Sequence, residues 1–267
     1  MADLKIRPHA PDADGRVLDI TPESAGWRYV GFSVHHCGEG QGFRHSLKGR
    51  ETCLVILSGR AAVKVDDMDF GVIGERNSVF DDVAPYAVYA PADALCDVKA
   101  VTDLEAAICT APGWSKLEPR LIEPSAIGMD ERGSGSNTRF VRNVLPETEP
   151  ADSLLIAEVI TPSGNWSSYP PHKHDSDDVP SESALEETYY YRMNPAQGFG
   201  FQRVYTDDRA IDEAVCVEDG DVVMVPKGYH PVGSPHGYDM YYLNVMAGPK
   251  RTWLIHNDPV HEWIVKR

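Results

Sequence analysis

Short alternations of apolar and polar residues run along most of the chain. Turn residues separate them, because 22 glycines and 20 prolines are spread evenly through the sequence. Alternation with a period of two, interrupted by turns about every eight to twelve residues, is typical of an all-β protein. The clearest predicted strands are 52–57, 61–65, 87–90, 154–160, 188–192, 199–206, 222–225 and 238–245.

The same order of elements occurs twice along the chain. Residues 27–37 predict a first strand rich in aromatic and β-branched residues. From Glu51, a Glu-led strand is followed by a Gly turn, a strand, a second Gly-containing turn and a Pro-bounded strand, and the second half repeats this order. Between them, 111–135 is rich in Pro, Gly and Ser and predicts a connector with at most one short helix. We therefore predict two related small β-barrels, 1–124 and 125–267.

The amino-acid composition limits the kinds of molecule that the chain is expected to bind. The 267 residues are 42% hydrophobic and 25% charged, which is ordinary for a globular protein. A net charge of −16 argues against nucleic acid. No apolar run approaches the ~20 residues that cross a bilayer, and the first residues are polar, so we expect no membrane association and a cytoplasmic location. Five scattered cysteines without a C-x-x-C favour reduced thiols over disulfides.

A set of histidines and carboxylates in the second half predicts a metal site. His172 and His174 are one residue apart, so in a strand both project from the same face. Glu186 and Glu187 open the next predicted strand, and only one of them can face the ion because neighbours in a strand point to opposite sides. His230 follows a later strand and a Pro-x-Gly turn. Such a mixed N/O set suits one divalent ion of Zn, Mn, Fe, Co or Ni.

The first half carries no comparable set. It offers His35, His36, His45 and Glu51, but no His-x-His before its Glu-led strand and no histidine after Pro85. We expect its barrel to be structural or to form one wall of the cleft.

These motifs resemble the cupin superfamily, whose metal motif runs His-x-His, Glu, and later Pro-x-Gly-x-x-His. Here His172, His174, Glu187 and His230 occupy it, with Glu187 preferred over Glu186 because the cupin Glu stands two residues ahead of the aromatic part of its strand. The acidic insert 175–182 lengthens the His-to-Glu gap, and the Pro-Gly-His spacing is one residue short.

Longer strings resemble one family more closely. GNWSSYPPHKHD, LEETYYYR, GFGFQRVYTDDR, VPKGYHPV and YYLNVMAGP are similar to the 5-deoxy-glucuronate isomerase family of inositol catabolism, which is related to 4-deoxy-threo-hexosulose-uronate ketol-isomerases. The resemblance implies an all-β bicupin and a divalent-metal-dependent aldose–ketose isomerase. It would convert 5-deoxy-D-glucuronate to 5-dehydro-2-deoxy-D-gluconate.

That chemistry calls for further groups. A proton shuttle would need an acid–base residue, whereas a hydride shift would need none, and the substrate carboxylate calls for a cation. The acid–base candidates are Glu186, Asp207, Tyr229 and Tyr241. The substrate-binding candidates are Lys173, Arg203, Arg209, Tyr205 and Tyr242. We prefer Arg203, which is in strand phase with Tyr205, since Arg209 could instead pair with the neighbouring aspartates. The tyrosines could equally pack within the barrel.

Two other functions stay open. One is a cupin oxygenase that uses non-haem iron, and the other is a non-catalytic sugar-acid-binding cupin. The polar, Tyr- and Arg-bearing surroundings favour a sugar acid over an apolar substrate and O₂, and the full metal set argues against a pure binding module. The expected partner is a small sugar acid. The sequence leaves open which metal is bound and whether the chain forms a homo-oligomer.

Overall fold

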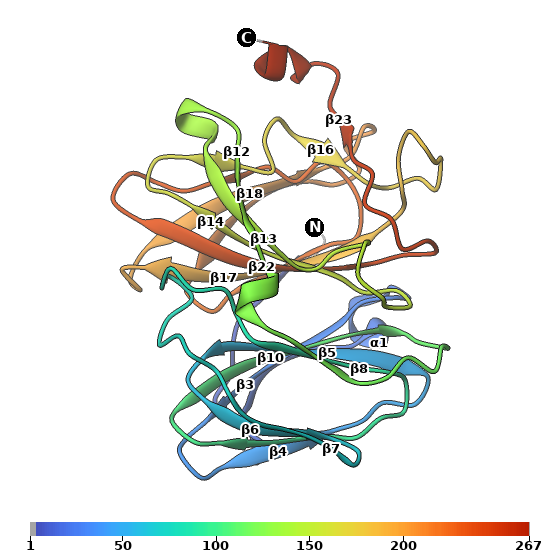
Figure 1. Ribbon diagram of the computed structural model, residues 1–267. Coiled ribbons are helices and arrows are strands. Elements are labelled where there is room, and N and C mark those ends of the chain that lie inside the picture. Colours follow the sequence, from blue (N-terminus) through green and yellow to red (C-terminus); the bar gives the residue numbers. More distant parts are fainter. Residues whose placement is uncertain (1–3, 267) are drawn as a thin grey trace. The chain divides into compact units, whose positions relative to one another are not determined.

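The regular secondary structure of the chain is almost entirely β-strand. The computed structural model describes residues 4–266 (Figure 1). The helices among these residues are short: α1 (Pro22–Ala25) and the 3-10 helices η1 (Pro124–Ala126), η2 (Gly135–Asn137) and η3 (Glu262–Lys266). Within the described range no helix has both the length and the apolar character needed to cross a bilayer.

Two compact units make up the described chain, and each is described by itself. The first barrel comprises Pro8–Gly128 and Asn143–Leu155. The second barrel comprises the residues up to Arg7, Met129–Arg142 and the residues from Ile156 onward. The chain therefore passes between the units more than once. The limits expected from the sequence, 1–124 and 125–267, stay a prediction.

The first barrel is built from two antiparallel sheets. Its strands are β2 (Arg16–Ile20), β3 (Gly31–Cys37), β4 (Gly42–His45), β5 (Arg50–Ser58), β6 (Ala61–Val65), β7 (Met68–Ile73), β8 (Ala87–Ala90), β9 (Cys96–Ala100), β10 (Leu104–Pro112) and β11 (Arg120–Ile122). They form a six-stranded sheet in the order β11-β8-β5-β10-β3-β2 and a four-stranded sheet in the order β4-β9-β6-β7. Alternate side chains, such as Leu54 and Ile56 of β5 and Val63 of β6, fill the space between the sheets.

The second barrel repeats this plan. Its strands are β1 (Lys5–Ile6), β12 (Met129–Arg132), β13 (Arg139–Leu145), β14 (Leu155–Thr161), β15 (Trp166–Ser167), β16 (His172–Lys173), β17 (Glu186–Asn194), β18 (Phe199–Tyr205), β19 (Asp212–Glu218), β20 (Val222–Val225), β21 (Val232–Gly233), β22 (Asp239–Ala247) and β23 (His256–Asn257). A seven-stranded sheet, β1-β20-β17-β22-β14-β13-β12, is accompanied by the four-stranded sheet β15-β21-β18-β19 and the pair β16-β23. Its core contains Tyr189, Tyr191 and Tyr242 besides aliphatic side chains.

The internal duplication is visible in the strand order. In the first barrel β8-β5-β10-β3-β2 lie side by side, and β20-β17-β22-β14-β13 follow the same order in the second. In each barrel, a short strand from outside this run covers one edge: β11 pairs with β8, and β1 pairs with β20. The prediction of an all-β bicupin is confirmed.

The strands predicted from alternation are present, and the errors fall where alternation is weak. The first predicted strand, 27–37, begins only at Gly31 as β3. The expectation of a plain connector at 111–135 was wrong, because this stretch contains β11 and β12 besides the 3-10 helix η1. Both are short edge strands, and β12 (sequence MDER) is largely exposed, so neither shows the buried face from which a strand is recognised.

Candidate metal centre and active site

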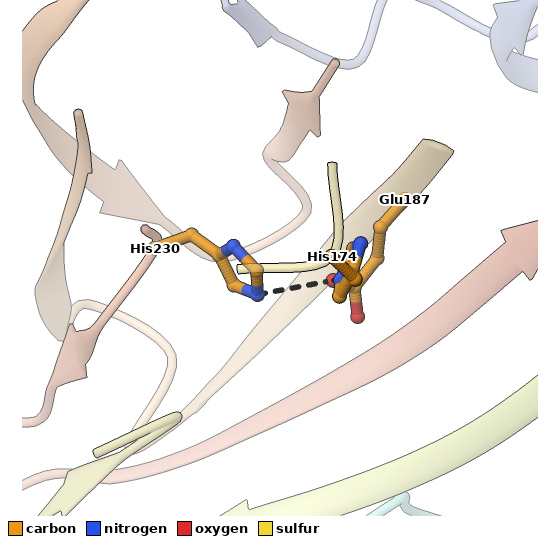
Figure 2. Close-up of side chains that lie close together, drawn as sticks. All are labelled: His174, Glu187 and His230. Atoms are coloured by element: carbon orange, nitrogen blue, oxygen red, sulfur yellow. Dashed lines mark hydrogen bonds and ion pairs between the residues drawn. The ribbon is translucent and has the colours of Figure 1, made fainter. Parts of the chain in front are cut away.

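Three buried side chains of the second barrel converge on one point. His174 follows β16, Glu187 is the second residue of β17, and His230 lies in the turn between β20 and β21. Their ligand atoms all lie within 4.8 Å of one another, and this is the only such His/Cys/Asp/Glu group found among residues 4–266. The Oε2 atom of Glu187 is 2.9 Å from Nε2 of His174 and 3.3 Å from Nε2 of His230 (Figure 2). We call these three residues the His–Glu cluster.

Backbone carbonyls orient both imidazoles of the cluster. Nδ1 of His174 donates to the carbonyl of Leu185 at 2.9 Å, and Nδ1 of His230 donates to the carbonyl of Gly228 at 2.7 Å. Each ring therefore turns Nε2 toward Glu187. In the described chain, Nε2 of His230 is buried without a hydrogen-bond partner. An orphaned imidazole nitrogen beside a carboxylate, with its other nitrogen fixed by a carbonyl, is the arrangement that metal-ligating histidines adopt. The donor set therefore fits a divalent ion.

Protonation within the cluster agrees with this assignment. Burial lowers the pKa of His230 to about 3, so this ring is neutral and its Nε2 carries a lone pair. Burial alone would lower the pKa of His174 too, but the hydrogen bond to Glu187 and its charge outweigh that effect and raise it. His174 therefore holds a proton between itself and Glu187. A divalent cation at this point would replace that proton, since metal binding deprotonates its ligands.

The other two predicted ligands lie beside the cluster. His172 is half-buried in β16, and its ring centroid is 4.9 Å from that of His230, at 82° between the planes. Burial lowers its pKa to about 3, with the charge of His174 adding to the effect, so His172 is also neutral. Neither His172 nor Glu186 belongs to the group of atoms within 4.8 Å. The structure thus brings together His174, Glu187 and His230, with His172 adjacent.

A charged network connects the two segments that deliver the histidines. Lys173 lies 3.2 Å from Asp207, 3.8 Å from Glu182 and 3.9 Å from Asp175, measured from Nζ to the carboxylate oxygens. Tyr229 donates to Asp207 at 3.0 Å. Burial would lower the pKa of Lys173, but its bond to Asp207 and the nearby acidic charges raise it overall. Lys173 and Tyr229 each directly adjoin a histidine, so this network holds the histidine-bearing segments together.

Two arginines predicted to bind substrate are engaged elsewhere. Arg203 is on the exposed face of β18 and donates to both carboxylate oxygens of Asp212, at 2.8 and 2.9 Å. Arg209 lies 3.8 Å from the same carboxylate. Both guanidinium groups stack on Tyr205, whose hydroxyl donates to Asp258 at 2.8 Å. The structure does not bring these side chains to the His–Glu cluster.

The two predicted tyrosines of β22 face opposite sides of their sheet. Tyr242 packs in the barrel core, with its ring centroid 4.9 Å from that of Tyr189. Tyr241 points to the other face, where it donates to Glu158 at 3.0 Å. Only Tyr242 therefore lies on the side of the cluster.

Two further residues of the barrel interior were not among the predicted site residues. The ring of Tyr189 is 5.7 Å from that of His230 between centroids, and its hydroxyl is 3.0 Å from Oγ of Ser168. Arg139 shares the inner face of β13 with Val141, a core residue. The available signal was strand phase, because Tyr189 is two residues after Glu187 and Arg139 two before Val141.

The first barrel has a different residue at the position equivalent to Glu187. In the second barrel Glu187 pairs with Val225, which a proline follows, and in the first barrel Thr52 pairs with Ala90, which a proline also follows. Both Glu187 and Thr52 are in phase with core residues of their strand. A cavity of about 1030 Å³ does lie in the first barrel, lined by residues such as His36, Arg76 and Glu105, but it contains no His–Glu cluster.

Comparisons with known proteins agree with this architecture. A family model described as KduI/IolB family matches residues 5–264. The 5-deoxy-glucuronate isomerase of Geobacillus kaustophilus (strain HTA426) is 55% identical over 266 residues, which is 100% of this chain and 96% of the relative. The enzyme of the same name from Bacillus subtilis (strain 168) is 49% identical over 252 residues, 94% of this chain and 93% of the relative.

Solved structures show the same likeness. An IolB-like protein from Salmonella typhimurium LT2 superposes with a TM-score of 0.96 and 48% identity, over 99% of this chain and 100% of that one. An oxalate decarboxylase of Bacillus subtilis superposes with a TM-score of 0.65 over 96% of this chain and 80% of that one. At 12% identity the second match shows a shared fold alone.

Proposed function

The chain belongs to the KduI/IolB family, and from this premise we propose that it is a divalent-metal-dependent aldose–ketose isomerase. The proposed reaction converts 5-deoxy-D-glucuronate to 5-dehydro-2-deoxy-D-gluconate, within myo-inositol catabolism. The observation that carries the proposal is the buried His–Glu cluster, in a chain 55% identical over its whole length to a 5-deoxy-glucuronate isomerase. The ion itself is one of Zn, Mn, Fe, Co or Ni, because such a donor set accepts several.

The proposed reaction moves a hydrogen between the aldehyde carbon and its neighbour. His174, Glu187 and His230, with His172 alongside, would hold the ion, which supplies a Lewis acid for the carbonyl and adjacent hydroxyl oxygens. Burial raises the pKa of both Tyr189 and Tyr242, so both phenols stay protonated. They can donate hydrogen bonds to sugar oxygens, but they are poorly suited to act as bases at neutral pH.

Turnover of the purified full chain tests the proposal. We expect NMR to show ketose formation from 5-deoxy-D-glucuronate, its loss after chelation, and its return when a divalent metal is added. His174→Ala should lose both bound metal and turnover while remaining folded, because it removes a buried ligand. His236→Ala is the matched control, since His236 is an exposed histidine of the same barrel.

Two results would contradict the proposal. Full activity of a metal-free protein would show that the reaction does not require the ion. If the metal-loaded protein showed no turnover, the bicupin fold would stand but the proposed substrate would be wrong. Binding of sugar acids without conversion would then favour a non-catalytic cupin.

A further inference from the structure

A uronate carries its carboxylate at the opposite end of the sugar chain from its aldehyde. An enzyme that holds the aldehyde at a buried metal therefore needs a cation elsewhere in the same cavity, preferably a guanidinium that can donate two parallel hydrogen bonds. The cations nearest the cluster in sequence are already engaged. Lys173 is shared among three carboxylates, and Arg203 and Arg209 are bound to Asp212 on an exposed face.

Arg139 is differently placed. It is the first residue of β13, two positions before the core residue Val141, so its side chain starts from the interior face of the second barrel. It is only partly exposed, and its Nη1 donates to the backbone carbonyl of Asn137 at 3.1 Å. Within residues 4–266 no carboxylate forms an ion pair with Arg139. Among the described residues, its positive charge therefore has no carboxylate to neutralise it.

A band of polar side chains connects this arginine with the cluster. Tyr189 packs against His230, and Tyr242 packs against Tyr189. The hydroxyl of Tyr189 is 3.0 Å from Oγ of Ser168, and Thr161, on the inner face of the neighbouring strand β14, donates to Ser167 at 2.7 Å. The strand next to β14 on its other side is β13, which begins with Arg139.

The charge of Arg139 also acts on this polar wall. Burial raises the pKa of Tyr242, a residue of this wall, and the positive charge of Arg139 offsets part of that rise. Burial lowers the pKa of Arg139 itself, but a guanidinium remains protonated in proteins. A partly buried cation that has no carboxylate partner among residues 4–266, next to a polar wall that leads to the His–Glu cluster, is suited to bind an anionic ligand group.

We propose that Arg139 binds the carboxylate of the substrate and so makes the second barrel selective for sugar acids over neutral sugars. This inference rests on the proposed isomerase function and adds the residue that sets its substrate class. The carboxylate would accept from the guanidinium while the aldehyde end reaches the His–Glu cluster along the tyrosine and serine wall.

Steady-state kinetics of the metal-loaded full chain can test this assignment. The two substrates are 5-deoxy-D-glucuronate and its neutral counterpart 5-deoxy-D-glucose. For Arg139→Gln we expect kcat/KM on the uronate to fall roughly 10- to 100-fold, mainly through KM, because hydrogen bonds to a charged group are lost. The kcat/KM of this variant on 5-deoxy-D-glucose should equal that of the wild type. Arg139→Lys should recover part of the lost kcat/KM on the uronate, because lysine keeps the positive charge but cannot donate two parallel hydrogen bonds to a carboxylate.

The control is Arg44→Gln, an exposed arginine of the first barrel that pairs with Asp97. Metal content and melting temperature of each variant show whether folding is intact. An equal loss on both sugars would mean that Arg139 is structural and would overturn the inference. So would a selective loss in Arg203→Gln with none in Arg139→Gln.

Failure of the proposed function can be told apart from failure of this inference. If the wild-type chain does not convert 5-deoxy-D-glucuronate, the turnover assay is replaced by calorimetric measurement of the binding of D-glucuronate and of D-glucose. Binding of glucuronate that is lost in Arg139→Gln would support the carboxylate site without the isomerase. Equal binding by wild type and variant would refute it.

Discussion

Replacing Asp175 by alanine should weaken metal binding although this residue is not a ligand. Asp175 directly follows His174, and its Oδ1 accepts from the backbone N–H of Gly228 at 2.7 Å. The carbonyl of the same glycine accepts from Nδ1 of His230 at 2.7 Å. One carboxylate therefore fixes the peptide that orients the second histidine. In the Asp175→Ala variant, that peptide loses its anchor and the ring of His230 can rotate.

The size of the effect follows from the bonds involved. A hydrogen bond to a charged group contributes about 1.5–3 kcal/mol, and loss of a partner that orients a metal ligand typically reduces metal affinity about 10- to 100-fold. The two ranges agree, since 1.4 kcal/mol corresponds to about a factor of ten. We expect a loss in that range for Asp175→Ala. Asp175→Asn should retain most of the affinity, because its amide oxygen can accept the same bond.

Competition between the protein and a chelator of known affinity would measure the loss. Asp177→Ala is the matched control, because Asp177 lies in the same acidic insert but pairs with Lys250, at 3.1 Å, rather than with the His230 turn. Unchanged affinity in Asp175→Ala would refute the reasoning. If Asp175→Asn were as weak as Asp175→Ala, the negative charge rather than the bond to Gly228 would matter.

Two further predictions concern the first barrel. Glu51→Ala should lower the free energy of unfolding by at least about 3 kcal/mol in urea denaturation, because the buried carboxylate accepts from three backbone N–H groups and from Tyr89; unchanged stability would contradict this. Burial lowers the pKa of His45 to about 4 from the usual 6.5. The unfolded chain therefore takes up this proton first, and stability should fall as the pH drops from 6.5 toward 4. His45→Gln should show a smaller fall over that range, and parallel curves for the two proteins would exclude the effect.

Local sequence pattern predicted the elements that depend on neighbours along the chain. Three such short-range features are the alternation in β17 and β22, the His-x-His pair and the Pro-x-Gly-x-His turn. They predicted that His174, Glu187 and His230 lie on adjoining segments of one barrel. Strand phase allowed only one of two consecutive glutamates to face the ion, and the resemblance to cupins favoured Glu187. The cluster contains Glu187 rather than Glu186.

Long side chains could not be placed in this way, because their partners come from other strands. Arg203 was expected at the substrate, but β19 brings Asp212 beside it, and only the register of that pairing reveals the ion pair. Lys173 is likewise held by acids from two other segments. Arg139 was passed over because β12, just before it, was not recognised as a strand, and because a strand at 138–145 does not by itself show which of its faces lies inside the barrel.

The leading glutamates of the two Glu-led strands differ in function because their positions in the strand differ by one residue. Glu51 and Glu187 occupy similar sequence contexts, yet Glu187 points into its barrel, whereas Thr52 takes that position in the first barrel. Glu51 therefore faces the other side of its sheet, where it accepts from the N–H groups of residues 152–154. Because side chains alternate with a period of two, a shift by one residue moves every side chain to the opposite face. The same carboxylate that could hold a metal ion in one barrel thus becomes a structural acceptor in the other, and the duplicated fold retains one His–Glu cluster among its described residues.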